Sequence, residues 1–458
     1  MASFGELQKP LLLIYKSLIR SVVDYGSVAY DSACSSLKNK LDSIQYQALR
    51  IATGAIHGTA ASALQVDTGE IPLYLRRYEL QLKYCSKVKA INDHPDATVF
   101  KHWRYEDSNK FNRNTRPIFS KVKDFFNQFE NDVIEPVTHS KIVPWKINYP
   151  SVDLDLTNEF KKNESPVILK CAALAKIDSF NDCLKIYTDA SKNNCGAAAA
   201  FYIPEFRLEG FAKLPELVSI YTAELIAIKL ALVWLNSVSF NIPNKILILS
   251  DSLSGLQSIS SGMSDSRPNL LHSIFELCTE IPSNITLLWI PSHIGIPGNE
   301  YVDAVAVKAT ERPFTDVHLN FEFRDFYKEI EKHVTSLWQE NWNSAQTGRK
   351  YFDLVPLVNR HIKYWEKNRY KEVCINRLRF GNCNLKAYLH RKKQHPTGLC
   401  TSCGCLETID HFLFHCNSPL VEHIRQVCLR ENIAHNLPTI LNSSILHDVI
   451  YKHINRTI

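Results

Sequence analysis

The sequence of 458 residues lacks the features that mark membrane-embedded or secreted proteins. No apolar run approaches the ~20 residues that span a bilayer, and residues 1–13 lack the basic start and long apolar core of a secretory signal. Internal repeats are also absent. These absences predict an intracellular protein, nuclear or cytoplasmic and not secreted, with no membrane partner. In that reducing compartment its 13 cysteines would be thiols or metal ligands.

The chain has little excess of either charge overall. Its 53 Lys and Arg stand against 47 Asp and Glu, and the net charge of +6 is weak evidence for a polyanionic partner. The excess is local, because residues 349–393 hold thirteen Lys and Arg and only three acids, a balance of +10. We call this segment the basic stretch. The remainder of the chain is therefore slightly acidic.

Changes in periodicity divide the chain into six regions. The first is helical, the second is a linker region with some structure, and the third alternates strands and helices. The last three are a basic helical region, a cysteine-rich segment and a helical tail. In chain order the regions are 1–95, 96–180, 181–312, 313–395, 396–420 and 421–458.

The third region has the pattern of a mixed sheet flanked by helices. The expected strands are Leu184–Thr188, Ala197–Ile203, Phe206–Ala212, Lys245–Ser250 and Ile285–Ile290. The expected helices are Tyr221–Leu235, Leu253–Ser260, Asn269–Ile281 and Asn299–Thr310. This order predicts an α/β fold with a mixed five-stranded sheet, between a helical N-terminal region and a helical C-terminal region.

Acidic residues follow two of these strands. Asp189 comes directly after the first strand, and Asp251 ends the apolar run of residues 246–249. Ligand sites in open α/β sheets lie at the carboxyl ends of strands, so both are candidates for one site. Taken singly, each has an ordinary alternative, because an aspartate at a strand end commonly caps a turn.

Two further acids lie on predicted helices. Glu224 shares a helix face with Ala227 and Ile228, the side that packs on the sheet, where a glutamate is costly unless it is paired or bound to a cation. Asp303 lies in the first turn of the last helix, where the helix dipole alone would favour an acid. In one cleft the four acids would repel each other, and divalent cations between them would offset that cost. Hard oxygen ligands select Mg²⁺ or Mn²⁺ rather than zinc.

Four short motifs carry these acids in an order that resembles the ribonuclease H family. They are Tyr187-Thr188-Asp189-Ala190-Ser191, Thr222-Ala223-Glu224-Leu225, Ser250-Asp251-Ser252 and Gly298-Asn299-Glu300-Tyr301-Val302-Asp303. Residues 289–295 resemble the family's loop before the last helix, which carries a histidine, here His293. The resemblance covers about residues 181–312.

The resemblance implies an endonuclease that cuts the RNA strand of an RNA–DNA hybrid and leaves a 5′-phosphate. The four carboxylates would hold two Mg²⁺ ions, or Mn²⁺, ~3.5–4 Å apart, which activate a water and stabilise the leaving 3′-oxygen. Recognition of the 2′-hydroxyl would distinguish RNA from DNA, and His293 would help proton transfer or product release. Some family members grip the hybrid with a basic helix, but residues 260–266 are short and hold no basic residue. Hybrid binding would therefore need another segment.

A group of potential metal ligands lies near the C-terminus. Cys400, Cys403, His411 and Cys416 have the spacing of a small tetrahedral zinc knuckle. Cys405 and His415 are alternative ligands, so the spacing leaves the register open. The competing interpretation is coincidence within a cysteine-bearing tail.

The basic stretch is interleaved with aromatic residues. Lys and Arg can neutralise phosphates, and rings such as Tyr364, Trp365 and Tyr370 can stack on bases. The alternative is an amphipathic helical domain whose aromatics form the core and whose charges are solvated. We expect both to hold, with single-stranded or duplex nucleic acid bound through residues 349–393.

The order of ribonuclease H domain, basic helical region and Cys-Cys-His-Cys knuckle resembles the end of the polymerase polyprotein of a jockey-like non-LTR retrotransposon. Near the start, Tyr25-Gly26-Ser27 and Gly69-Glu70-Ile71-Pro72-Leu73 resemble the thumb region that follows a reverse transcriptase palm. No Tyr/Phe-x-Asp-Asp polymerase motif occurs, so we expect no polymerase activity. The resemblance predicts a truncated element product or a host gene derived from one.

Three functions are open at this point. They are an active hybrid-specific endonuclease, a catalytically silent nucleic-acid-binding protein that keeps the fold, and a non-enzymatic zinc scaffold. The presence of all four carboxylates favours the first, because degraded enzymes commonly lose a ligand. We expect no small-molecule cofactor.

Overall fold

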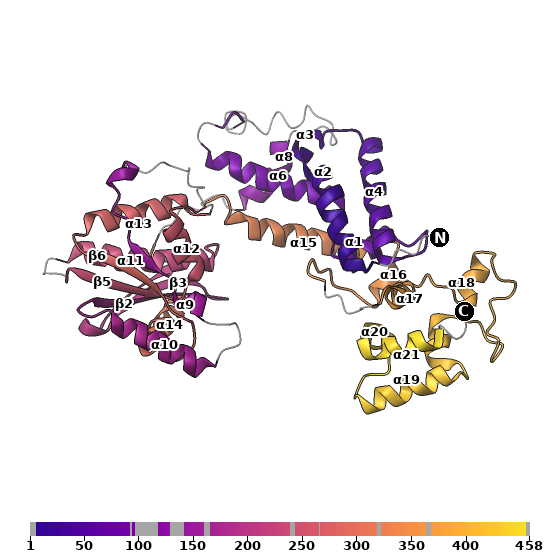
Figure 1. Cartoon of the computed structure of the whole chain (residues 1–458). Helices are drawn as coiled ribbons and strands as arrows, with labels where there is room; N and C mark the ends of the chain where they lie inside the picture. The colour runs from indigo at the N-terminus through magenta and orange to yellow at the C-terminus, as the bar shows by residue number, and fades with distance from the viewer. Residues whose placement is uncertain are drawn as a thin grey trace. The chain divides into compact units, whose positions relative to one another are not determined.

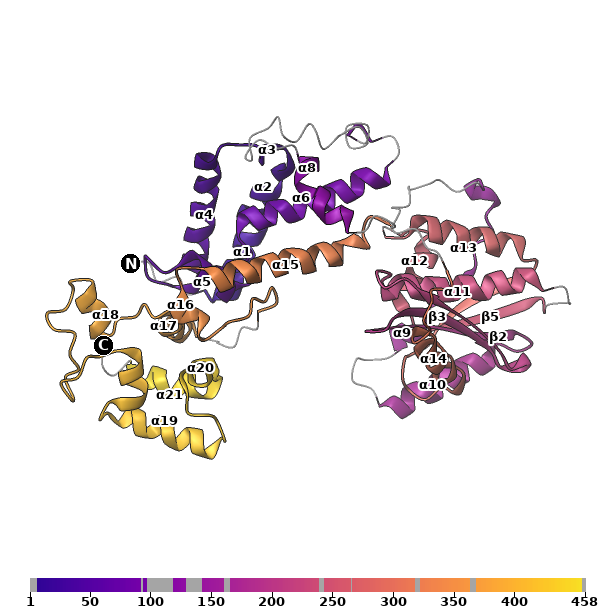
Figure 2. The same ribbon diagram turned by 180° about the vertical axis from the view of Figure 1, so that it is seen from behind.

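The computed structural model describes residues 6–91, 94–96, 118–128, 142–159, 165–238, 243–264, 266–317, 322–362 and 368–454. These residues divide into two compact units (Figures 1 and 2). The sheet unit takes its described residues from 85–103 and 124–329. The helical unit takes its described residues from 1–84, 104–123 and 330–458.

The sheet unit is built on a six-stranded sheet with the strand order β1-β6-β5-β2-β3-β4. The strands are β1 Ser151–Asp153, β2 Leu184–Asn193, β3 Gly196–Ile203, β4 Leu208–Leu214, β5 Lys245–Ser250 and β6 Asn284–Trp289. Neighbours from β1 to β2 run parallel, and β3 is antiparallel to both β2 and β4. The predicted mixed five-stranded sheet is confirmed. It gains β1, which comes from the region expected as a linker.

Helices cover both faces of this sheet. α11 (Ile220–Ser237), α12 (Leu253–Ser261) and α13 (Pro268–Glu280) lie on one face, and α10 (Pro166–Ser179) and α14 (Pro297–Thr310) on the other (Figures 1 and 2). Short helical segments join these elements: η3 Pro144–Lys146, α9 Leu156–Glu159 and η4 Pro204–Phe206. On the α10 and α14 face, Ala173, Ile177, Val302 and Ala306 pack in one core with the sheet.

Strand β3, between β2 and the edge strand β4, permits close approach of helices because its residues are small. Ala197, Ala198, Ala199 and Ala200 are fully buried, and both α11 and α14 pack against this strand. Successive side chains of a strand point to opposite faces, so the four alanines present short side chains to both helices. The positions of α11 and α14 matter because each carries one of the acids predicted to form the site.

Among the described residues, α11 is the one helix long and apolar enough to cross a membrane. In the structure 56% of its apolar window is buried, and Ala227, Ala231 and Leu235 point into the core. A core helix of a soluble protein passes the same test of length and composition. The feature is therefore weak evidence for a membrane span.

Residues that follow α14 in the chain also belong to the sheet unit. The backbone N–H of Asp316 donates to the Lys213 carbonyl on the edge strand β4, and the Lys213 N–H donates to the Asp316 carboxylate. Further along, the Arg267 guanidinium is buried and pairs with Asp325 while donating to Thr222. These contacts fasten Asp316 to the sheet, and Asp325, through Arg267, to α11.

The helical unit combines the two ends of the chain. Its N-terminal elements are α1 Gln8–Ile14, η1 Tyr15–Arg20, α2 Ser21–Asp24, α3 Ser27–Tyr30, α4 Ser35–Thr53 and α5 Ala61–Thr68. Its C-terminal elements are α16 Arg349–Phe352, α17 Arg369–Arg379, α18 Lys386–Arg391, η5 His411–His415, α19 Pro419–Arg430, α20 Leu437–Asn442 and α21 Ser444–Ile454. Three helices cross a boundary between the two sets of residues: α6 Leu73–Ala90, α8 Ile118–Asn127 and α15 Phe326–Ser344.

A buried polar network joins these two ends. The Asp67 carboxylate accepts hydrogen bonds from the Tyr351 hydroxyl and the Arg379 guanidinium, both at 2.7 Å. Gln8 of α1 donates its side-chain N–H to Asp67 at 3.2 Å and its backbone N–H to Glu372 at 2.8 Å. Buried polar groups are costly unless they are paired, so these contacts specify how α1 and α5 pack on α16 and α17.

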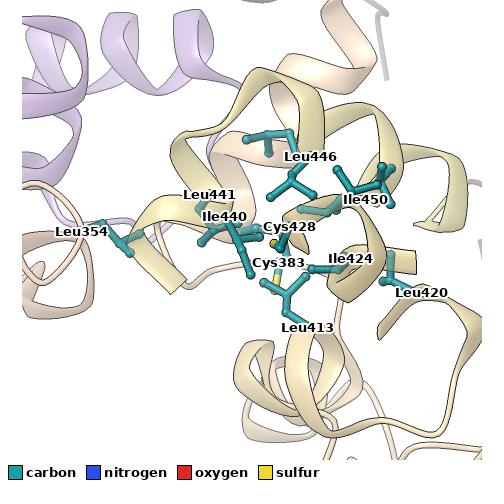
Figure 3. Packing of buried hydrophobic residues seen from close by; sticks show 14 residues of the cluster. Leu354, Cys383, Leu413, Leu420, Ile424, Cys428, Ile440, Leu441, Leu446 and Ile450 are labelled. Carbon is teal, nitrogen blue, oxygen red and sulfur yellow. The ribbon is translucent and has the colours of Figure 1, made fainter. Parts of the chain in front are cut away.

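The last helices of the chain enclose a hydrophobic core of their own. It includes Leu420, Ile424 and Cys428 of α19 with Leu446 and Ile450 of α21 (Figure 3). α17, α20 and η5 also contribute to this core. η5 supplies the buried Leu413 between two of the predicted zinc ligands, so this core holds the metal-ligand segment in place.

Candidate active site and metal centre

Three of the predicted acids meet at one edge of the sheet. Asp189 lies within β2, which continues to Asn193 instead of ending before the acid as the sequence predicted. Its parallel neighbour β5 does end there, since the last pair between the two strands is Thr188 with Ser250. Asp251 follows β5 directly. Glu224 lies near the start of α11, where the Ser219 side chain caps the helix by accepting the Thr222 N–H.

These three side chains form a tight acidic triad. One carboxylate oxygen from each of Asp189, Glu224 and Asp251 lies within 4.8 Å of the others. Burial, followed by repulsion from Asp251, raises the pKa of Asp189 to about 8. Burial, followed by repulsion from Asp189, raises the pKa of Glu224 well above its ordinary value. Burial also raises the pKa of Asp251, against a hydrogen bond from Asn299.

The triad fits a divalent cation. Glu224 is 7% exposed, and its buried Oε2 atom has no hydrogen-bond partner among the described residues. A buried, unpaired carboxylate oxygen next to two other carboxylates is unfavourable, and a bound cation would satisfy all three groups. The donors are hard oxygens, which match Mg²⁺ or Mn²⁺.

Asp303, the fourth predicted acid, lies in the same cleft but in a second group. It lines the cleft together with the triad and His293, and it contributes to the repulsion that raises the pKa of Asp189. One oxygen of the Asp303 carboxylate lies within 4.8 Å of ligand atoms of His293 and Glu300, and these three residues form a group separate from the triad. Asp303 Oδ2 is 3.8 Å from His293 Nδ1. The structure thus brings all five predicted residues to one cleft. Asp189, Glu224 and Asp251 form one group in it, and Asp303 and His293 belong to the other.

Two residues in the cleft wall were not singled out from the sequence. Glu300 joins His293 and Asp303, and Asn299 is buried and bonds Asp251. Both lie in the motif that predicted Asp303, one turn earlier on α14. The motif was therefore visible in the sequence, but the sequence did not indicate which residues of the motif contact the cleft.

Backbone geometry holds the His293 loop at the cleft. His293 has a positive φ of 52° and a side chain that is 74% exposed. Gly295, with φ of 82°, donates its N–H to Glu300 at 3.0 Å, which ties the loop to α14. At Gly298 an added Cβ would lie 2.3 Å from the Tyr187 ring, so only glycine allows α14 to pack this closely on β2. That close packing brings Asp303 near the triad.

The predicted zinc ligands also meet, in the helical unit. Cys400, Cys403, His411 and Cys416 place their ligand atoms within 4.8 Å of one another. Cys400 Sγ is 3.7 Å from Cys416 Sγ, and Cys403 Sγ is 3.2 Å from His411 Nε2. Burial opposes ionisation of Cys400, but hydrogen bonds from His411 and from the Ser402 backbone outweigh it and lower the pKa of the thiol to about 6. Thiolates are the form of cysteine that binds metals.

The fold distinguishes these ligands from the two alternatives. A bridge between Leu399 and Leu406 closes a small hairpin, and inside it the Cys400 N–H donates to the Cys405 carbonyl. Cys405 is exposed and outside the cluster. His415 is 66% exposed and faces Asp410. Three thiols and one imidazole in this arrangement suit tetrahedral zinc.

Internal packing engages much of the basic stretch. Arg360 pairs with Glu79 at 3.0 Å and Arg379 pairs with Asp67 at 2.7 Å. Five other side chains of the stretch also bind partners inside the helical unit: Arg349, Arg369, Lys371, Arg377 and Lys386. These cations satisfy acids and helix-end carbonyls of the protein itself. These seven cations already have partners within the protein, and the expected binding of nucleic acid through residues 349–393 stays a prediction.

The aromatic residues of the stretch mostly belong to the core. Tyr351, Phe380 and Tyr388 are buried, and Phe352 is half-buried. Tyr370, at 66%, is the exposed ring among the described residues of the stretch. Tyr364 and Trp365, proposed as stacking rings, lie outside the described residues. The alternative interpretation, aromatics as core, holds for the three buried rings.

Comparison with known proteins bears on the sheet unit. No curated protein matches the chain. The family model for RNase H matches residues 181–311, a span that contains both groups of cleft residues and five of the six strands. With the mixed sheet, the buried triad and this match, residues 181–311 are an RNase H domain.

Proposed function

We propose that this protein is an endonuclease that hydrolyses the RNA strand of RNA–DNA hybrids with two divalent cations. The observation that carries the proposal is the buried triad of Asp189, Glu224 and Asp251, with one carboxylate oxygen left without a partner inside an RNase H domain. Such an arrangement costs stability in the absence of a cation. A chain that only binds nucleic acid has no need to keep it.

The residues of the cleft would have different roles in metal binding and proton transfer. Asp189, Glu224 and Asp251 would hold one cation, and Asp303, at the edge of the cleft, would help hold a second. Bound cations supply an activated water and a stabilised leaving 3′-oxygen. His293 lies with Nδ1 toward Asp303, which leaves Nε2 to exchange a proton with the substrate or with solvent. Its exposed position suits a group that acts at the mouth of the cleft.

The Cys400 cluster would hold one structural Zn²⁺. All four ligands come from the protein, so no position is left for a substrate, which is the property of structural zinc sites. The four ligands connect the hairpin, η5 and the start of α19, and a bound ion would order this segment. We assign it no part in the chemistry of the cleft.

We further propose that the chain derives from a jockey-like non-LTR retrotransposon and acts inside the cell, in the nucleus or cytoplasm. Support comes from the order of the RNase H domain, the basic stretch and the Cys-His cluster. The thumb-like motifs add to it: Gly26 and Gly69 both have positive φ and follow or precede short helices. Template-dependent incorporation of nucleotides by this chain alone would contradict the expected lack of polymerase activity.

Cleavage of a labelled RNA–DNA hybrid by the purified chain with Mg²⁺ tests the main proposal. We expect cuts in the RNA strand alone, abolished by EDTA and reduced by at least about a thousandfold in Asp251→Asn. Asp178→Asn makes the same change at an exposed position of α10 and is the matched control, with activity close to the parent. Hybrid binding without cutting in the parent would instead support the silent nucleic-acid-binding protein.

A further inference from the structure

Among the described residues of the basic stretch, four cations have neither an ion pair nor a side-chain hydrogen bond. They are Lys350, Arg391, Lys392 and Lys393, and all four are exposed. This separates them from the cations that pack within the helical unit. Exposed and unpaired cations are the ones that can neutralise another molecule's charge without breaking internal contacts.

Chain folding places Lys350 and Arg391, which come from two separate segments, near one buried thiol. The buried Cys383 thiol lies in the field of both Lys350 and Arg391, and both favour its ionised form. Lys350 also packs along Gly381, where an added Cβ would lie 3.0 Å from its Cδ. Arg391 and Lys392 lie over the Tyr388 ring, 5.1 and 5.8 Å from its centroid. We call Lys350, Arg391, Lys392 and Lys393 the Tyr388 patch.

The patch is held by the segment that carries the metal ligands. The Lys386 N–H at the start of α18 donates to the Glu407 carboxylate at 2.7 Å, and the Lys386 ammonium donates to Thr401 at 3.2 Å. Lys393, with φ of 59°, ends α18 and donates its N–H to His390. Glu407, the acid nearest to the patch in these contacts, is paired with Lys386. The metal-binding hairpin thus orders α18 and the cations at its end.

We propose that the Tyr388 patch, rather than the basic stretch as a whole, binds the sugar-phosphate backbone of nucleic acid. Three exposed cations at the end of α18, with Lys350 contributed by α16, suit a polyanion with regularly spaced phosphates. The RNase H domain brings no basic residue at 260–264 and 266, so a second contact is needed. The choice of an RNA–DNA hybrid as that polyanion rests on the proposed function, whereas phosphate binding by the patch does not.

Binding is measured by fluorescence anisotropy with the full chain carrying Asp189→Asn, which prevents cutting. The probes are an RNA–DNA hybrid and a single-stranded RNA of the same length, each over a range of salt concentrations. The patch variant is Lys350→Gln/Arg391→Gln/Lys392→Gln/Lys393→Gln. The control, Lys40→Gln/Lys87→Gln/Arg425→Gln/Arg430→Gln, removes the same charge from exposed positions elsewhere along the chain. Zinc content and the melting temperature verify that each variant is folded.

The patch variant should lose at least about tenfold in affinity, and the slope of log K against log salt should fall by about 3, close to 0.9 for each phosphate contact. The control should bind within about twofold of the parent. A charge-retaining variant, with Lys350, Lys392 and Lys393 changed to Arg and Arg391 to Lys, should bind like the parent. The two probes show whether the patch reads duplex or single strands.

Three results would overturn the proposal. The first is equal binding of the nucleic acids by the patch variant and the parent. The second is an equal loss of affinity in the control variant, which would leave only net charge as the cause. The third is patch-dependent binding of vesicles containing phosphatidylserine with no effect on either nucleic acid. Cleavage by the wild-type chain is scored separately, so failure of the patch and failure of the endonuclease give different results.

Discussion

The surroundings of Asp189, Glu224 and Asp251 raise the pKa of each carboxyl group. Burial is the first cause at each position, and repulsion from other carboxylates of the cleft adds to it. The pKa of Asp189, raised to about 8, means that this carboxyl still holds a proton at neutral pH in the metal-free fold. A divalent cation would displace that proton, so metal binding and proton release are coupled.

Stability without metal should fall as pH rises. Asp189 has a folded pKa of about 8 against an ordinary value of 3.8, so between about pH 4 and pH 8 the folded state binds more protons than the unfolded state. The free energy of unfolding therefore decreases with pH across this window. Thermal melting in EDTA at a series of pH values measures the effect. Added Mg²⁺ should raise the melting temperature most at the high end of the window.

Asp189→Asn should remove the pH-dependent loss of stability and reduce the stabilisation by Mg²⁺. The amide removes the group that must ionise, so the metal-free variant should be more stable than the parent near pH 8, by about 1 kcal/mol or more. It also removes a ligand, so Mg²⁺ should no longer raise its melting temperature by the full amount. The exposed Asp178→Asn serves as the control. A variant that melts like the parent with and without Mg²⁺ would argue against a metal site at Asp189.

Secondary-structure elements outside the family match complete the RNase H fold. β1 extends the sheet beside β6, and α10 contributes the fully buried Ala173 and the nearly buried Ile177 to its core. On the other side, Asp325 neutralises the buried Arg267. β1, α10 and Asp325 all lie outside residues 181–311. The folding unit is therefore longer than the segment that carries the motifs.

A fragment of residues 142–329 should fold, whereas residues 181–311 alone should not melt cooperatively. The short fragment exposes apolar surface that α10 covers, and it leaves Arg267 buried without Asp325, a loss of ~3–5 kcal/mol for a broken buried pair. Circular dichroism during heating compares the two. Arg267→Met in the long fragment tests the ion pair separately, because it removes the charge that needs a partner. Equal melting of both fragments would show that the flanking elements are dispensable.

At the scale of the whole molecule, the two ends of the chain fold together. The hydrogen bond from Gln8 to Glu372 joins residues 364 positions apart, and Asp67 connects α5 with Tyr351 and Arg379. Long-range contacts of this kind gain their energy only after a large loop is closed. The N-terminal helices are therefore part of the same cooperative unit as α16 and α17.

Asp67→Ala should destabilise the helical unit by about 3 kcal/mol or more, because it leaves the Arg379 charge and the Tyr351 hydroxyl buried without their partner. Urea denaturation followed by tryptophan fluorescence measures the change, since Trp338 and Trp342 are buried in this unit. Asp448→Ala breaks an exposed pair with Lys371 and should cost less than about 1 kcal/mol. A similar cost for both variants would contradict the role given to the network.

Removal of zinc should affect the helical unit alone. Cys400→Ser should abolish the zinc bound per chain and lower the melting temperature, whereas Cys405→Ser should keep the metal because Cys405 lies outside the cluster. Metal analysis of the purified variants decides the register. With Mg²⁺ and saturating hybrid, cleavage should persist in Cys400→Ser because the RNase H domain belongs to the other unit, whereas hybrid affinity through the Tyr388 patch should fall. Full zinc content in Cys400→Ser would exclude this ligand set.

The sequence alone predicted which side chains meet in the cleft and in the Cys400 cluster. The four acids stand in short motifs, and Cys400, Cys403, His411 and Cys416 have a spacing that zinc sites require. Both signals are local, since residue type and spacing along a strand, a helix or a tight hairpin determine which side chains can meet. The mixed five-stranded sheet was predictable for the same reason, because alternation and helical periodicity are local properties.

Tertiary structure decided how these pieces are used. It divided the acids into a buried triad and a more exposed group with Asp303, His293 and Glu300. It also engaged five cations of the basic stretch in internal ion pairs, among them Arg379 with Asp67 and Arg360 with Glu79, which lie hundreds of residues apart in the chain. Charge counted along a sequence cannot distinguish a cation that faces solvent from one that faces a distant acid. That distinction depends on contacts between segments that only the folded chain brings together.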